Sequence, residues 1–388
     1  MNRSQKSICF VAPFIYPLLA GNGSGVGGAE RQFFLFGREI AKRGWNVSYI
    51  TDFLSKKNSK NCTLFSVEHS SFTYLGGSNY YILLNWLHLL WVMKKLSADY
   101  YVIKTPSHLL APMAFYCSLA KKKLVFWSQT SSDFKPDQRS SRKIANIFSD
   151  WGINKTDIII AQTKDQLAEI LNSYKKNAYH VPSIYDELMH GADGLQEGGC
   201  HKDIDVLWVG NSLSLKRYEV VIELAKKMPL VKFVLAMNNA DRYRFEQARK
   251  LSNDHENLTF LGQVPPPAMT DWFRRSKLLL NTSSREGFPN TFLQAWMRNV
   301  PVVSLGIDPD RLLVRKKIGW VVDEKNVQKC GNDFSALAEL LVHPIKELLL
   351  NEGLRNQIGA RGKKYVKENH SPPKTIMKLL CALSNDKK

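Results

Sequence analysis

Short apolar runs alternate with amphipathic stretches along nearly the whole chain. In the first half, runs typical of strands occupy residues 8–13, 46–51, 100–103, 123–127 and 157–161. In the second half, they occupy residues 204–209, 232–237, 258–261, 277–281 and 301–305. Helical patterns lie between them. Strands separated by helices indicate βαβ units, in which a parallel sheet carries helices on both faces. Two such sets predict an α/β protein with two doubly wound domains.

A polar, glycine-bearing stretch with little periodicity separates the two sets. Such stretches are typical of domain boundaries. We therefore predict an N-terminal domain at 1–185, a linker at 186–201 and a C-terminal domain at 202–370. Two prolines, at 372 and 373, break the last long helix, which is predicted at about 347–369, and leave a short helix near 375–383. We expect the terminal segment, 371–388, to pack back on the N-terminal domain.

The beginning of the chain has features of a signal peptide, because a basic start precedes an apolar run at residues 8–20. Two prolines within this run fit a signal helix poorly, so we interpret it as part of the folded protein. A second apolar stretch at 80–93 is about fourteen residues long, which is too short to span a bilayer. The six cysteines form no C-x-x-C motif and are expected to be reduced thiols.

Glycines cluster between the first predicted strand and the first helix, where Gly23, Gly25 and Gly28 formally match G-x-G-x-x-G. With Asp52 at the end of the second strand, this match favours dinucleotide binding. The loop begins about ten residues after the strand, however, whereas that fingerprint begins where the strand ends. A glycine loop before a helix also exposes backbone N–H groups to an anionic ligand. A plain surface loop is the alternative.

Two cations, Lys216 and Arg217, follow a strand and a short turn in the second domain, at the predicted start of a helix. Cations there oppose the helix dipole, at a cost of roughly 0.3–1 kcal/mol each, unless an anion lies beside them. A local rule broken at the carboxyl end of a parallel strand is typical of a functional site. Solvated surface charges are the alternative.

A second candidate segment, NTSSREGFPNTFLQA, ends a strand in small polar residues and opens a helix near Asn290 or Thr291. The free N–H groups of that helix predict a phosphate site beside Lys216 that needs no metal. Glu286, just before the helix, can accept hydrogen bonds from sugar hydroxyls. Two structural alternatives remain: Gln294 forms a capping box with Thr291, and Glu286 interacts only with the helix dipole.

These residues resemble the retaining glycosyltransferases of family 4, whose GT-B fold consists of two Rossmann-like domains that face each other across a cleft. The resemblance lies in GGAE at 27–30, in the strand–turn–lysine segment 209–216 and in EGFPNTFLQAW at 286–296. It covers nearly the whole chain, including KKYVKENHS at 363–371, which is similar to the family's closing segment. It implies that the N-terminal domain binds the acceptor and that the C-terminal domain binds a nucleotide-sugar donor.

The resemblance also implies how the donor diphosphate is held. Lys216 matches the lysine that contacts the diphosphate in the family. The arginine that accompanies it there is replaced by Asn211, so half of the clamp is missing. Arg217 and Arg285 are candidates to substitute for it.

Contacts with the sugar and the ribose follow from the same resemblance. Glu286 matches the first of two paired glutamates, which contacts the transferred sugar, whereas the second, ribose-binding glutamate is replaced by Gln294. An amide can still hydrogen-bond a ribose diol, so we expect weaker or altered donor recognition. The family's first-domain histidine has no clear counterpart, and Ser132 and Asp133 occupy a similar place. The expected catalytic residues are Glu286, Lys216 and Asp133. The expected donor-binding residues are Gly27, Gly28, Asn211, Lys216, Arg217, Glu286, Gly287, Phe288, Asn290, Thr291 and Gln294.

Departure of a nucleoside diphosphate builds negative charge on phosphate oxygens, and Lys216 and the helix start near Asn290 are expected to stabilise that charge. The resemblance implies that the acceptor hydroxyl attacks from the face that the diphosphate leaves, with retention of configuration. We expect no cofactor and no metal. The D-x-D sequences at 203–205 and 308–310 stand at a strand entry and in an unrelated context, so we interpret them as incidental.

Lysine and arginine total 54 against 35 acidic residues, a formal net charge of +19, so the surface attracts anions. Without a recognisable recognition module, we expect no nucleic-acid partner. The aromatic stretch 80–93 is followed by lysines at 94–95 and 121–123, which favours contact with an anionic membrane through Trp86 and Trp91. A buried aromatic stripe is the alternative.

The resemblance implies a glycosyltransferase that extends a glycan or lipid-linked glycan in cell-surface polysaccharide assembly. With the charge and the aromatic stretch, it leads us to expect a cytoplasmic protein, peripheral at the inner face of the cytoplasmic membrane. Two other classes stay open. Asn211 and Gln294 suggest a non-catalytic nucleotide- or glycan-binding member of the same fold. The glycine match and Asp52 suggest an NAD(P)-dependent oxidoreductase, which leaves Lys216 and Glu286 without a role.

Overall fold

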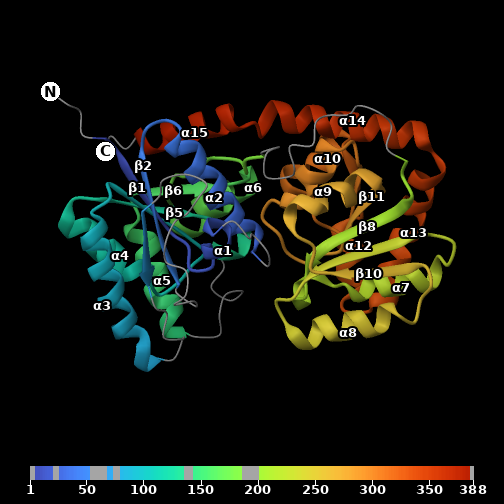
Figure 1. The fold of residues 1–388 in the computed structure, drawn as a ribbon, viewed down its shortest axis with the longest axis horizontal. Coiled ribbons are helices and arrows are strands. Elements are labelled where there is room, and N and C mark those ends of the chain that lie inside the picture. The colour runs from blue at the N-terminus through green and yellow to red at the C-terminus, as the bar shows by residue number, and fades with distance from the viewer. Residues whose placement is uncertain are drawn as a thin grey trace. The chain divides into compact units, whose positions relative to one another are not determined.

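A computed structural model describes residues 5–20, 26–52, 68–72, 79–134, 143–185 and 201–384 (Figure 1). The chain forms two compact units. The first comprises Met1–Ile184 and Pro372–Lys388, and the second comprises Tyr185–Ser371. The chain therefore leaves the first unit once and returns to it at its end. The linker expected at 186–201 lies, except for His201, outside the described residues.

A parallel sheet is the centre of the first unit. Among the described residues it contains seven strands in the order β3-β2-β1-β4-β5-β6-β7. They are β1 (Ser7–Val11), β2 (Asn46–Asp52), β3 (Glu68–Phe72), β4 (Tyr100–Lys104), β5 (Lys123–Trp127), β6 (Ile158–Ala161) and β7 (Tyr179–His180). The strand order reverses between β1 and β4, as in the doubly wound folds that bind nucleotides.

Helices cover both faces of this sheet. They are α1 (Tyr16–Leu19), α2 (Gly28–Ala41), α3 (Asn79–Leu96), α4 (Leu110–Ala120), α5 (Lys143–Lys155), α6 (Lys164–Tyr174) and α15 (Pro372–Ser384), with a 3-10 turn, η1, at Ser131–Phe134. Neighbouring strand residues point to opposite faces, and both faces are apolar, which is typical of a buried parallel sheet. Phe10 contacts Phe33 of α2, whereas Cys9 belongs to the core beneath α3, α4 and α5.

The terminal helix α15 packs against α2 and β6 of the first unit (Figure 1). The Tyr100 hydroxyl, at the start of β4, donates a hydrogen bond of 3.0 Å to the Leu383 carbonyl near its end. The segment after Pro372 is thus part of the first unit although it follows the whole second unit in sequence.

The second unit repeats the same architecture. Its sheet, within the described part of the chain, has six parallel strands in the order β10-β9-β8-β11-β12-β13. They are β8 (Ile204–Asn211), β9 (Phe233–Asn238), β10 (Leu258–Gly262), β11 (Ser276–Asn281), β12 (Val302–Ser304) and β13 (Gly319–Val321). The helices are α7 (Glu219–Lys227), α8 (Arg242–Ser252), α9 (Pro266–Arg275), α10 (Asn290–Met297), α11 (Leu312–Lys316), α12 (Glu324–Cys330), α13 (Phe334–Leu350) and α14 (Glu352–Asn369), with 3-10 turns η4 (Ser214–Lys216) and η5 (Pro309–Arg311).

The two-domain α/β fold predicted from the sequence is confirmed, and each of the ten predicted strands is present. Strand β3, which has a mostly polar sequence, and the short strands β7 and β13 were not predicted. The predicted start of the last long helix, near residue 347, is wrong. Asn351 separates α13 from α14 and caps α14, because its side chain accepts a hydrogen bond of 2.9 Å from the Leu354 N–H. A side-chain cap of this kind ends one helix and begins the next without a long loop.

Two glycines of α14 provide a matched test of packing. A Cβ atom at Gly359 would lie 2.2 Å from the Asn299 carbonyl oxygen, whereas one at Gly353 would meet only the Asn351 side chain at 3.6 Å. We expect Gly359→Ala to lower the free energy of unfolding by about 1–3 kcal/mol, because the backbone of α14 must move away. Gly353→Ala should be neutral or stabilise by up to about 1 kcal/mol through helix propensity. Urea midpoints followed by tryptophan fluorescence measure both changes, and equal midpoints for the two variants would contradict the close approach.

Candidate active site

The second unit brings its candidate residues to one edge of the sheet. β8 and β11 are neighbouring parallel strands, so the loops that follow them, after Asn211 and after Asn281, meet at the same carboxyl edge. The strand order reverses between β8 and β11. In open α/β sheets, ligands bind outside the carboxyl ends of strands at such a switch point.

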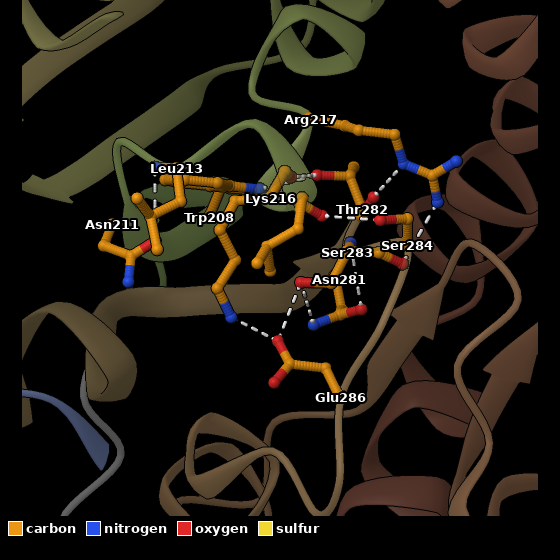
Figure 2. Close-up of polar contacts among 11 residues, drawn as sticks. Trp208, Asn211, Leu213, Lys216, Arg217, Asn281, Thr282, Ser283, Ser284 and Glu286 are labelled. Atoms are coloured by element: carbon orange, nitrogen blue, oxygen red, sulfur yellow. Dashed lines mark hydrogen bonds and ion pairs between the residues drawn. The ribbon is translucent and has the colours of Figure 1, made fainter. Parts of the chain in front are cut away.

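A chain of hydrogen bonds joins the two loops (Figure 2). The Trp208 indole Nε1 donates to the Thr282 hydroxyl at 2.9 Å, and that hydroxyl donates to the Lys216 carbonyl at 2.6 Å. The Ser284 N–H donates to the Leu215 carbonyl at 2.8 Å. Trp208 and Thr282 are buried. The main chain of Lys216 is therefore held against the β11 loop.

Lys216 and Glu286 form an ion pair at this edge, with Lys216 Nζ directed at Glu286 Oε1 (Figure 2). The same carboxylate oxygen accepts a hydrogen bond of 2.8 Å from the Ser283 hydroxyl. The two side chains are 19% and 17% exposed, so solvent still reaches both charges. The sequence predicts that the helix start after Glu286 faces the same crevice as Lys216, and in the structure Lys216 contacts Glu286 directly.

Arg217 has a different role from the one expected of it. Its backbone is in the left-handed region, with φ of 48°, and its side chain is buried. The guanidinium donates to the carbonyls of Thr282 at 2.7 Å and Ser283 at 3.0 Å. Burial lowers its pKa from the usual value. The idea that Arg217 substitutes for the arginine missing at Asn211 is wrong, because its donors hold the β11 loop from inside the unit.

Asn211 ends β8, and its side-chain oxygen accepts a hydrogen bond of 3.3 Å from the Leu213 N–H. This bond shapes the turn that leads to Lys216, as short polar side chains commonly do in turns. Arg285 is exposed on the β11 loop next to Glu286. Arg285, and not Arg217, is therefore the exposed arginine that remains a candidate to substitute for the arginine replaced by Asn211.

Helix α10 begins four residues after Glu286. Asn290 is its first residue, as predicted, and Pro289 is the N-cap, with no side-chain cap hydrogen bond at this described helix start. The capping box considered for Gln294 and Thr291 is wrong, because Thr291 lies inside the helix and is not its N-cap. The first N–H groups of a helix carry partial positive charge and suit anions.

Of the other expected donor-binding residues, Phe288 is buried and its ring lies 4.9 Å from the ring of His370. Its side chain therefore anchors the loop in the core, and only its main chain is suited to meet a ligand. Gly287 precedes it and is partly exposed. Gln294 is buried one turn into α10.

In the first unit, a buried ion pair of Lys104 with Glu30 lies beside the two glycines at the start of α2. Gly27 is the N-cap of α2 and Gly28 its first residue. A Cβ at Gly27 would lie 2.7 Å from Glu30 Oε2, and Glu30 Oε1 is 2.5 Å from Lys104 Nζ. Burial lowers the pKa of Lys104, and the Glu30 carboxylate opposes that shift. A larger residue at position 27 would therefore displace the end of the Glu30 side chain. Gly23, Gly25 and the Asp52 side chain lie outside the described part of the structure.

Asp133, expected to be catalytic, holds its own loop together. One carboxylate oxygen accepts hydrogen bonds from the N–H groups of Gln129 at 2.7 Å and Thr130 at 3.0 Å and from the Ser128 hydroxyl at 3.2 Å. The other accepts from the Thr130 hydroxyl at 3.1 Å. Burial raises the pKa of Asp133, and these hydrogen bonds oppose the rise. The structure therefore assigns it a structural role. The Ser132 side chain lies outside the described residues.

The two D-x-D sequences are engaged in structural contacts. Asp203 forms a two-pronged ion pair with Arg275 at 2.9 and 2.5 Å, which lowers the pKa of Asp203 to about 2. Asp205 accepts from Lys277 at 2.7 Å, and Asp308 accepts from a backbone N–H of α11 at 2.7 Å. No group of three or more histidine, cysteine or acidic side chains placed to hold a metal occurs in the described ranges.

Trp208 and Lys104 were not among the residues predicted for a site, and Thr282 and Ser283 were predicted only as small polar residues at a strand end. A lysine that ends the apolar strand β4 is a detectable signal, because buried lysines are rare unless paired. Trp208 and Thr282 are recognised only when the two loops are seen together.

The chain matches known families over both units. Residues 196–365 match the family Glycosyl transferases group 1, and residues 26–185 match Glycosyltransferase Family 4. None of the curated proteins is similar enough in sequence to count as a relative.

Solved structures share the fold at low sequence identity. Sucrose-phosphate synthase from Thermosynechococcus elongatus is 14% identical, with a TM-score of 0.74 and 97% of each chain covered. A glycosyltransferase from Rickettsia africae is 14% identical, with a TM-score of 0.73 over 98% of this chain and 100% of that one. WaaG, a glycosyltransferase involved in lipopolysaccharide biosynthesis, is 16% identical, with a TM-score of 0.69 over 95% and 98%. With both sequence families matched and the two doubly wound units in place, the chain belongs to the group 1 glycosyltransferases and has the GT-B fold.

Proposed function

We propose that this glycosyltransferase is a retaining enzyme that moves a sugar from a nucleoside-diphosphate sugar to a hydroxyl of a glycan or lipid-linked glycan. The observation that carries the proposal is the half-buried ion pair of Lys216 with Glu286 at the switch point of the second sheet. The pair places a cation and a sugar-binding carboxylate within one contact of each other, just before the start of α10.

The charges of the site match the chemistry of the leaving group. When the bond between sugar and diphosphate breaks, negative charge grows on the phosphate oxygens. Lys216 and the N-terminus of α10 are fixed donors for that charge, and fixed donors need no reorganisation during the reaction. In the proposed mechanism they neutralise the diphosphate without a metal or cofactor.

Retention of configuration is part of the proposal and rests on the family 4 resemblance. The acceptor hydroxyl attacks from the face that the diphosphate leaves, while Glu286 accepts hydrogen bonds from hydroxyls of the transferred sugar. The first unit takes the acceptor, and the resemblance implies that Gly27 and Gly28, at the start of α2, approach both the donor phosphates and the acceptor. The likeness of the fold to WaaG, a lipopolysaccharide enzyme, supports a role in cell-surface polysaccharide assembly.

A second candidate function, binding without catalysis, is favoured by the side chains at two donor positions. Asn211 occupies the place of a diphosphate-binding arginine, and Gln294 that of a ribose-binding glutamate. Turnover of a donor distinguishes the two functions, because a binding protein is stabilised by nucleotides but releases no product.

Ligand-induced thermal stabilisation tests the donor site. We expect one nucleoside diphosphate among a panel to raise the melting temperature, since a ligand at 100 times its dissociation constant adds about 2.7 kcal/mol of stability. Lys216→Ala should abolish this shift, because it removes the cation that meets the phosphates. Lys250→Ala, at an exposed lysine of α8, should keep the shift. If no nucleotide stabilises the folded wild-type protein, the proposed donor site is wrong.

Glu286→Gln tests the sugar contact. The amide keeps the size of the side chain and can bond to Ser283, but it loses the charge that faces the sugar. We expect kcat for transfer to fall about 10²–10³-fold, as for the loss of one transition-state contact, while stabilisation by the nucleoside diphosphate persists. Release of nucleoside diphosphate in the presence of acceptor measures the rate. Glu246→Gln, in an exposed ion pair of α8, is the control and should react at the wild-type rate.

Gln294→Glu tests the altered ribose position. A carboxylate forms stronger hydrogen bonds to a diol than an amide does, so the dissociation constant of the preferred nucleoside diphosphate should fall roughly three- to tenfold. Gln294→Ala should raise it. Calorimetric titration measures both constants. If neither substitution changes nucleotide affinity, Gln294 does not contact the ribose.

A further inference from the structure

Three helices of the first unit, α3, α4 and α5, pack against one another on one face of its sheet (Figure 1). Their inner sides are in the core: Val92 of α3, Met113 of α4 and Ile153 of α5 are fully buried. Trp86 also points inward, since its ring meets Phe148 of α5 at 4.8 Å. The expectation that Trp86 contacts a membrane is therefore wrong.

The outward sides of these helices are also apolar. On α3, Leu83, Leu87 and Trp91 are spaced by four residues and form one exposed stripe. Leu119 of α4 is 69% exposed and Ile147 of α5 is 65% exposed. We name this surface the apolar helix face, and its exposed members are Leu83, Leu84, Leu87, Trp91, Phe115, Leu119, Ile144, Ile147 and Trp151. Large exposed apolar side chains gathered on adjoining elements mark interaction surfaces.

Lysines gather at the same end of the three helices. Helix α3 leads into β4, α4 into β5 and α5 into β6. The C-terminal ends of the three helices therefore lie where these parallel strands begin. Exposed lysines stand there: Lys94 and Lys95 on α3, Lys121 after α4 and Lys155 on α5. Lys95 Nζ lies 5.7 Å from the centre of the Trp91 ring, directly beside the apolar stripe.

Acidic side chains are almost absent from these helices. The sequences of α3 and α4 contain none, and α5 contains only Asp150, whose carboxylate accepts a hydrogen bond from the Tyr174 hydroxyl. Among the described residues, no helix is long and apolar enough to cross a membrane. The three helices thus present a surface that is apolar and cationic.

We propose that the apolar helix face docks the first unit on an anionic lipid bilayer. The apolar side chains enter the headgroup region, and the lysines at the helix ends contact lipid phosphates and carboxylates. This inference goes beyond the transfer reaction, because it does not depend on the donor site. A second copy of the chain fits this face less well. A two-fold interface would set the same cationic surface against itself, whereas an anionic bilayer neutralises it.

Co-sedimentation of the full chain with vesicles tests the proposal. We expect binding to vesicles of phosphatidylcholine with 30% phosphatidylglycerol that is at least tenfold tighter than binding to phosphatidylcholine alone, and weaker as salt rises. The double variants Leu87→Gln/Leu119→Gln and Lys94→Glu/Lys95→Glu should each weaken binding at least tenfold. All four positions are exposed, so the fold should be retained, which the melting temperature checks.

Matched controls lie on the second unit. Leu230→Gln/Leu350→Gln removes two leucines that are also highly exposed, and Lys250→Glu reverses an exposed lysine. Both should bind vesicles as the wild type does. Equal losses in test and control variants, or no binding of the wild type to anionic vesicles at low salt, would overturn the proposal. So would sedimentation velocity showing a dimer that the leucine variants at 87 and 119 dissociate, if that dimer does not bind vesicles.

A direct readout of insertion comes from Trp91, which is 60% exposed. Brominated acyl chains should quench part of the tryptophan fluorescence of the vesicle-bound wild-type protein. Trp91→Phe should lose that part while it still binds the vesicles. Quenching of equal size in Trp91→Phe would exclude insertion of this stripe.

Discussion

The parallel pairing of β8 with β11 is the constraint on which the site depends. It carries two loops that are remote in sequence to the same edge, where Lys216 and Glu286, seventy positions apart, form their ion pair. One hydroxyl, that of Thr282, accepts from the Trp208 indole and donates to the Lys216 carbonyl, so it fixes one loop on the other. The main chain of Lys216 is therefore positioned by buried hydrogen bonds between the two loops, and the flexible side chain of the lysine is not needed for this.

Arg217 also holds the two loops together, although its backbone is in the left-handed region and its charge is buried. A non-glycine residue in the left-handed region costs of the order of 1–3 kcal/mol, and the guanidinium is buried as well. Its hydrogen bonds to the carbonyls of Thr282 and Ser283 offset both costs, because a buried charge is tolerated when its donors are satisfied. A fixed positive charge thus lies beneath the β11 loop that carries Glu286. The strained backbone at residue 217 is thus compensated by the hydrogen bonds with which Arg217 fixes the β11 loop.

The sequence allowed the architecture to be predicted because periodicity reports on burial. The strands that lie in apolar runs were predicted. Strand β3, EHSSF, has a mostly polar sequence, and β7 and β13 have only two and three residues, so none of the three gives an apolar pattern. A site that combines Lys216 with the helix start after Glu286 was predicted, because both follow the carboxyl ends of parallel strands. The roles of Arg217 and Asp133 were not, because the direction of a side chain at a strand end depends on loop geometry. An arginine that is buried and hydrogen-bonded to carbonyl groups cannot be distinguished in the sequence from an exposed arginine that binds a phosphate.

Two ion pairs of the molecule differ in whether their charges are available to a ligand. Glu30 and Lys104 neutralise each other inside the first unit and leave little charge for a ligand. Lys216 and Glu286 are also paired, but both are reached by solvent, so their partners can be exchanged. In the proposed reaction a diphosphate takes the lysine, and the carboxylate turns to the sugar hydroxyls. Each half of the pair is thus stabilised by the other until the donor, which carries both an anion and hydroxyl groups, replaces both contacts at once. A ligand with only one of these features leaves one charge unpaired, and because an unpaired, partly buried charge is costly, the pair itself favours the complete donor.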